Sequence, residues 1–216
     1  TAPIRHLVYS FTYGSQQSIS ARDATTISAG SNISHYGGSL GDKGTMTIDV
    51  VSEQADKGLV VSISEQGEAT RRAPPATCVV YGNTSVICDP NKTVNPEEYT
   101  LLRFLASNFV DPSQIDAKQH WSVKQDGNDF NVRADYVIDN NSGGIMSISE
   151  TRSVAYGAPR STTTNIQTKI GYDFKRLLPT SVDEYITQRA DAGARGTSTT
   201  IYQTTLKLVS DSMAKT

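Results

Sequence analysis

Residues 130–139 read Phe-Asn-Val-Arg-Ala-Asp-Tyr-Val-Ile-Asp, an almost perfect alternation of apolar and polar side chains. A period of two places neighbouring side chains on opposite faces of a β-strand, so this stretch predicts a strand with one buried face. The turn sequence Asp126-Gly127-Asn128 precedes it, and the Asn- and Gly-rich stretch 140–144 follows it. Strands separated by such short turns pair as antiparallel neighbours.

The same alternation recurs along the chain and predicts about ten strands. Residues 5–13 place Leu7, Tyr9, Phe11 and Tyr13 on one face. Further strands are expected at 45–52, 59–65, 121–125, 145–156, 162–175, 183–190 and 199–210. The segment 14–44 is rich in Ser and Gly and lacks this period, so it predicts a long mobile loop.

One helix is expected at about 96–110. Asn95 is a good N-cap, Pro96 suits the first helical position, and Glu98 completes a capping box. Leucines and phenylalanines then form a wide apolar stripe, and Asp111-Pro112 ends the pattern.

The predicted fold class is mainly β (α+β). One helix of about 15 residues can cover only two or three strands. Because most strands have an apolar face, the sheet itself must bury the rest. We therefore expect a curled antiparallel sheet that forms a half-barrel, a barrel or a sandwich. No domain boundary is visible, so residues 1–216 are taken as a single domain.

The two cysteines favour an oxidising compartment. If residues 79–87 form a hairpin with the loop Gly82-Asn83-Thr84, Cys78 lies directly opposite Cys88, within reach of a disulfide. Two buried free thiols are the alternative. A disulfide implies a secreted or periplasmic protein. The chain opens on Thr1 without an initiator methionine, as a processed mature chain does, and it has no apolar run long enough to span a membrane.

Charge and histidine spacing exclude several classes of partner. With 20 Lys and Arg against 22 Asp and Glu, the formal net charge is -2, whereas nucleic-acid binders are usually basic. His6, His35 and His120 are far apart and have no neighbouring ligand at metal-binding spacing. We therefore expect no nucleic acid, no metal and no cofactor.

Two motif matches lack the context that their chemistry needs. Ser39 lies in a G-x-S-x-G sequence, but a nucleophile elbow requires a strand before it and a helix after it. A serine hydrolase therefore stays a minor alternative, and no catalytic residue is assigned. Residues 139–150 match several positions of a calcium-binding loop, yet the flanking segments are strands rather than helices.

Six residues are the candidate ligand-binding set. Glu150 and Arg152 share a strand face with apolar residues, and buried charges are usually paired or functional. A bulge that turns both outward is the commoner outcome in curled sheets, and we keep it as the favoured alternative. Aromatic side chains on inward faces would line a concave pocket for an apolar ligand. The aromatic members of the set are Tyr136, Tyr156, Tyr172 and Phe174.

These observations favour a secreted or periplasmic non-enzymatic binding protein, which carries an apolar small molecule or lipid in a cavity under the curled sheet. The alternative is a structural subunit of a surface or extracellular assembly. In that case the N-terminal strand 5–13, tethered by a long loop, would pair with a neighbouring subunit to form a homo-oligomer.

Overall fold

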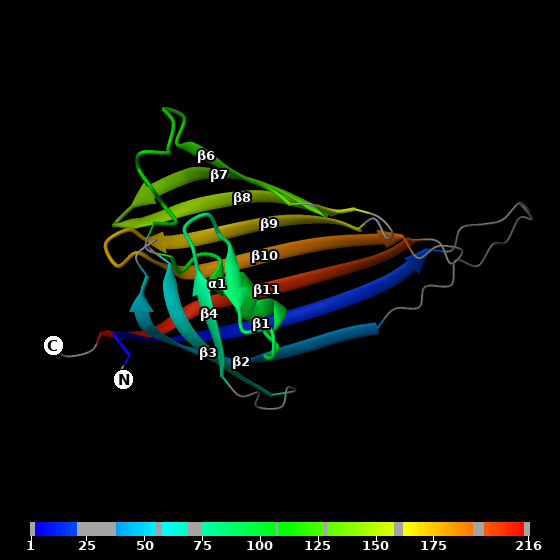
Figure 1. Cartoon of the computed structure of the whole chain (residues 1–216), viewed down its shortest axis with the longest axis horizontal. Coiled ribbons are helices and arrows are strands. Elements are labelled where there is room, and N and C mark those ends of the chain that lie inside the picture. The colour runs from blue at the N-terminus through cyan, green and yellow to red at the C-terminus, as the bar shows by residue number, and fades with distance from the viewer. Residues whose placement is uncertain are drawn as a thin grey trace, which may run out of the picture.

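Eleven strands form one antiparallel sheet in the computed structural model, which describes residues 3–20, 38–54, 58–68, 75–106, 108–127, 129–157, 162–191 and 197–213. Their order is β5-β4-β3-β2-β1-β11-β10-β9-β8-β7-β6. The sheet curls around a core but does not close, since β5 and β6 are its two edges (Figure 1). Of the three expected architectures, the structure is thus the half-barrel.

Most strand bounds follow the period of two, whereas β1 and β2 extend beyond it. The strands are β1 Arg5–Ser20, β2 Gly38–Glu53, β3 Leu59–Gly67, β4 Ala76–Val80, β5 Val86–Cys88, β6 His120–Asp126, β7 Phe130–Ser142, β8 Ile145–Tyr156, β9 Thr162–Asp173, β10 Leu178–Asp191 and β11 Thr197–Met213. Between β7 and β8 only Gly143 and Gly144 turn the chain, and both have a positive φ that a side chain would disfavour.

The first strand lies inside its own sheet. β1 pairs with β2 on one side and with β11 on the other, so the first and last strands of the chain are neighbours (Figure 1). Leu7, Tyr9 and Phe11 are buried. The hypothesis that strand 5–13 pairs with a neighbouring subunit is therefore wrong, because both of its hydrogen-bonding edges are occupied within the chain.

The predicted loop at 14–44 is much shorter than expected. Residues 14–20 continue β1, and residues 38–44 open β2 opposite them, with Gly14 paired to Gly41. These polar residues extend the strands because backbone hydrogen bonds do not require apolar side chains. The centre of the predicted loop, 21–37, lies outside the described residues.

The β4–β5 hairpin has the predicted register. Cys78 pairs with Cys88 and Val80 with Val86, and the two cysteines form a disulfide. The inward residues Cys78 and Val80 are fully buried, whereas Ile87 on the opposite face is 62% exposed. The disulfide therefore joins the edge strand β5 to the rest of the sheet.

The helix is shorter than predicted. α1 spans Pro96–Leu102, and the Glu98 carboxylate accepts the Asn95 backbone N–H at 2.8 Å, as a capping box requires. Residues 103–106 and 108–110 lie in turns and irregular structure, with bonds from Phe104 N to Leu101 O and from Phe109 N to Ala106 O. Nearly all described side chains of this segment are buried. A regular helix with one apolar stripe would leave its other face exposed, so the helix ends before this segment. In the described part of the chain, no helix has the length and apolarity to cross a membrane.

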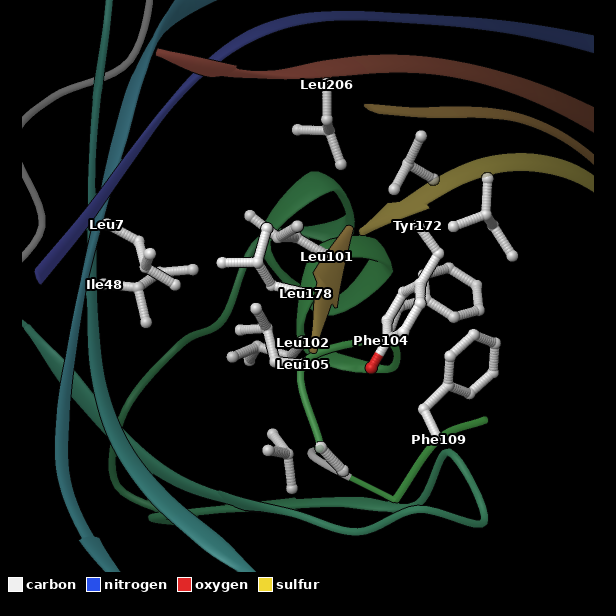
Figure 2. Close-up of a cluster of buried hydrophobic side chains, with 14 of the residues drawn as sticks. Leu7, Ile48, Leu101, Leu102, Phe104, Leu105, Phe109, Tyr172, Leu178 and Leu206 are labelled. Atoms are coloured by element: carbon white, nitrogen blue, oxygen red, sulfur yellow. The ribbon is translucent and has the colours of Figure 1, made fainter. Parts of the chain in front are cut away.

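One core fills the concave side of the sheet. Figure 2 shows Leu101, Leu102, Phe104 and Leu105 between Leu7 and Ile48 on one side and Tyr172 on the other. Phe109 makes edge-on contacts with the rings of Phe104, Trp121, Tyr136 and Tyr172. The segment 101–110 is thus the central packing element of the core.

We predict that reducing the disulfide lowers the unfolding midpoint without unfolding the protein. Closing a loop of about 11 residues contributes about 2.7 kcal/mol, against about 5–15 kcal/mol for a whole domain. Intact mass after alkylation without reductant should show no alkylated thiol. Two alkylated thiols in fresh, unreduced protein would contradict the bond, and a Cys78→Ala/Cys88→Ala variant gives the reference midpoint.

Candidate functional site

The sheet register arranges inward side chains of β7 to β11 in transverse rows, because paired residues lie side by side, and three neighbouring rows build the site. The core row is apolar and consists of Ile138, Ile148, Ile170, Val182 and Leu206. The polar row comes next and consists of Tyr136, Glu150, Thr168, Glu184 and Thr204. The groove row follows and consists of Ala134, Arg152, Ile166, Ile186 and Tyr202.

Arg103 connects the helix segment to the polar row. Its Nη1 donates to Glu150 Oε1 at 2.9 Å and to Oε2 at 3.1 Å, and its Nη2 bonds Glu184 Oε2. All three side chains are at most 4% exposed. The guanidinium therefore bridges β8 and β10 from above the sheet, and its face also covers the ring of Phe104 at 4.7 Å.

Neutral groups complete the hydrogen bonding of the carboxylates. Tyr136 Oη donates to Glu150 Oε1 at 2.9 Å, and Thr168 Oγ1 donates to Glu150 Oε2 at 2.6 Å. Thr100 Oγ1 donates to Glu184 Oε1 at 2.6 Å. Burial alone would raise the pKa of Glu150, but Arg103 and these donors hold it below its ordinary value. Glu150 is thus a carboxylate at neutral pH.

A groove of about 830 Å³ opens beyond the polar row, within the size range of small-molecule sites. Its floor comes from the far halves of β7 to β11, and one wall comes from α1 and the β4–β5 hairpin. In Figure 1 these strands continue well past α1 and β4. The apolar side chains lining the floor include Phe130, Val132, Val154, Ile166, Ile186 and Tyr202.

Arg152 lies where the polar row meets the groove. Its Nη1 donates to Thr84 Oγ1 at 2.7 Å, which ties β8 to the tip of the β4–β5 hairpin across the concave face. Ser85 Oγ lies 3.5 Å from Gln125 Oε1 of β6. The hairpin therefore reaches from one edge of the curled sheet toward the other and closes one side of the groove.

Of the six predicted ligand-binding residues, two line the groove, three are packed in the interior, and one, Phe174, is exposed. Arg152 and Tyr156 line the groove. Tyr136, Glu150 and Tyr172 face inward but are packed in the polar row or the core.

The structure corrects two of the sequence-based expectations. Glu150 and Arg152 do not turn outward at a bulge, because β7 and β8 keep a regular register along this stretch. Phe174 does not lie on an inward face. β9 ends at Asp173, and Phe174 is 40% exposed in the following turn.

Sequence reasoning missed Arg103 and Glu184. Each interrupts an apolar pattern, since Arg103 lies within Leu-Leu-Arg-Phe-Leu and Glu184 lies two residues after Val182 and two before Ile186. A search for charges on predicted buried faces would have found both. Their pairing depends on where the helix segment lies over the sheet, which no local pattern contains.

The two motif matches have other structural roles. Ser39 lies within β2, opposite Gln16, rather than at a turn from a strand into a helix. Residues 139–144 form the β7–β8 hairpin, and Glu150 is occupied by the polar row. Within the described ranges, no three His, Cys, Asp or Glu residues are placed to hold a metal ion.

A second group of buried carboxyls lies under the start of α1. Glu65, Glu97 and Glu98 are each at most 5% exposed, and Asn95 Nδ2 donates to Glu65 Oε1 at 3.1 Å. Among the described residues, no hydrogen bond reaches Glu65 Oε2 or Glu97 Oε2. Burial, followed by the charges of Glu97 and Glu98, raises the pKa of Glu65 to about 8. Burial raises the pKa of Glu97 as well, so this group of carboxyls holds a proton at neutral pH.

Comparison with known proteins shows similarity at the level of the fold. No family model and no curated protein matches this chain. A solved structure described as "Lipid-protein interactions in lipovitellin" superimposes with a TM-score of 0.51 over 99% of this chain, at 12% sequence identity. This chain spans 26% of the length of that lipovitellin chain.

A second solved structure, described as "Asymmetric conductivity of engineered proteins", has a TM-score of 0.26 and 8% identity, over 94% of this chain and 100% of that chain. A similarity this low carries no argument. What the comparisons establish is that this chain shares the fold of one segment of lipovitellin.

We predict that Arg103→Met destabilises the protein by about 3–5 kcal/mol, because two buried carboxylates lose their counter-ion. Urea unfolding followed by the fluorescence of Trp121 measures the change. The matched control is Arg133→Met on the exposed face of β7, which should cost less than about 0.5 kcal/mol. Equal losses in the two variants would show that the buried ion pairs do not hold the fold.

We predict that Glu65 makes the protein less stable as pH rises. Its pKa is about 8 in the folded protein against an ordinary 4.5, so the folded state binds this proton more tightly. Its stabilising contribution is full below pH 4.5 and is lost progressively up to about pH 8.

Glu65→Gln should weaken the fall of stability with pH, with Glu97 and Glu98 supplying the remainder because burial raises their pKa values too. The variant should be relatively more stable than wild type above pH 8. The exposed Glu68→Gln is the control, and urea unfolding at pH 5, 7 and 9 is the measurement. If the free energy of unfolding changes with pH equally in wild type and Glu65→Gln, Glu65 does not carry the raised pKa.

Proposed function

We propose that this chain is a non-enzymatic binding protein that carries an apolar small molecule or lipid in the groove beside the polar row. The observation that supports this most directly is the apolar floor of the groove. Val132, Val154 and Ile166 are at most 9% exposed but do not belong to the main core cluster. Instead, they line the groove of about 830 Å³. Lining of this kind is typical of sites for apolar ligands.

The fold similarity supports the same proposal. The lipovitellin structure concerns lipid–protein interactions, and this chain shares the curled sheet of one of its segments. The disulfide between Cys78 and Cys88 is compatible with a secreted or periplasmic location, where such bonds persist. A location outside the cytoplasm is therefore part of this proposal.

Native mass spectrometry and organic extraction of purified protein should reveal a bound apolar molecule, and added fatty-acid probe should bind. Ile186→Gln places a polar amide on the groove floor and should weaken probe binding by about tenfold, since burying an unpaired amide costs about 1–3 kcal/mol.

Tyr185→Gln is the matched control, because the neighbouring side chain is 39% exposed on the opposite face of β10. Its affinity should equal that of wild type. The proposal fails if neither native nor added apolar molecules bind, or if Tyr185→Gln weakens binding as much as Ile186→Gln.

A further inference from the structure

The two buried arginines of the site differ in how fully the protein satisfies them. Arg103 bonds Glu150 through both carboxylate oxygens and also bonds Glu184. Among the described residues, Arg152 has one hydrogen bond to the protein, from Nη1 to Thr84 Oγ1. A guanidinium has five N–H donors, so most of the donors of Arg152 have no protein acceptor among the described residues.

Glu150 cannot supply the missing acceptors. A carboxylate has about four lone-pair positions, and Glu150 already accepts two bonds from Arg103, one from Tyr136 and one from Thr168. The closest approach of Arg152 to Glu150 is 3.8 Å, from Nη1 to Oε1, which is too long for a hydrogen bond. Arg152 thus forms an ion pair with Glu150 without a hydrogen bond, and most of its N–H donors remain available to a ligand.

The residues around Arg152 indicate the chemistry of such a ligand. Arg152 lines the groove, and its neighbours across the sheet are Ala134 on β7 and Ile166 on β9. From Ile166 the groove row continues to Ile186 and Tyr202 without another charge. From Arg152 on β8 to Tyr202 on β11 this row spans about 14 Å, at about 4.8 Å per strand. Arg103 and Glu184 also line the groove, but they bond each other. Arg152 is thus the cation with unused donors beside this apolar track.

We propose that the groove binds a single-chain amphiphile with an anionic headgroup, held by Arg152 while its chain lies along Ile166, Ile186 and Tyr202. This inference rests on the proposed function and adds the ligand class to it. A planar guanidinium matches the paired oxygens of either a carboxylate or a phosphate, so an anionic oxygen headgroup is the shared chemistry.

The test compares four ligands with the same 16-carbon chain in displacement of a fluorescent fatty-acid probe. They are hexadecanoate, hexadecyl phosphate, hexadecanol and hexadecyltrimethylammonium. At least one anion should bind about tenfold or more tightly than hexadecanol, because a hydrogen bond between charged groups contributes about 1.4 kcal/mol or more, which is a factor of ten in affinity. The stronger of the two anions identifies the headgroup.

Variants of Arg152 assign the preference to this side chain. Arg152→Gln should remove the advantage of the anion over hexadecanol, and Arg152→Lys should keep part of it. Arg133→Gln, on the exposed face of β7, should keep all of it. Circular dichroism melting of each variant verifies folding, and if Arg152→Gln fails to fold, the Arg152→Lys ratio decides the question.

The outcomes separate the two proposals. If none of the four ligands binds, the proposed function fails and the inference fails with it. If hexadecanol or the cationic ligand binds as tightly as both anions, the groove is apolar without headgroup selection, and only this inference is overturned. The same holds if Arg152→Gln leaves the ratio of anion to alcohol affinity unchanged.

Discussion

The structure depends on the ion pairs that Arg103 makes with Glu150 and Glu184. Removing three charges from water is costly, and the cost is recovered only when the geometry is good and every remaining lone pair is satisfied. The sheet provides that geometry, because the register of β8, β9 and β10 places both carboxylates on one row with Thr168 between them. The ion pairs in turn fix the position of α1 and of residues 103–110 over the sheet, so they specify the packing of the core as well as joining its parts.

The polar row also divides the concave face. On one side the core row packs against the leucines and phenylalanines between residues 101 and 109. On the other side the strands continue past α1, and the groove row faces an open space. Arg152 lies at this boundary with unused donors, and Thr84 positions it from the disulfide-bonded hairpin. The polar row thus borders the core on one side and the proposed amphiphile site on the other.

Much of this fold could be predicted from local sequence patterns. The period of two located nearly every strand, the turn residues fixed the hairpins, and the opposed cysteines gave the disulfide register. The failures have physical causes. Polar residues 14–20 and 38–44 form strands through backbone bonds that hydrophobic patterning does not report. The helix ends early because its apolar stripe continues into an irregular segment that is buried on all sides. The Arg103 ion pairs join residues 47 and 81 positions apart in sequence, and that pairing follows from the curl of the sheet.

Methyl NMR tests the central claim, that the polar row separates a dry core from a ligand groove, most directly. Ile166 and Ile170 lie on the same strand and face, about 13 Å apart on opposite sides of the polar row. With isoleucine methyl groups labelled, addition of hexadecanoate should shift the signals of Ile166 and Ile186 and give them contacts to the ligand chain. The signals of Ile148 and Ile170 should stay in place. Ligand contacts to Ile148 and Ile170, or equal shifts at all four residues, would contradict the account.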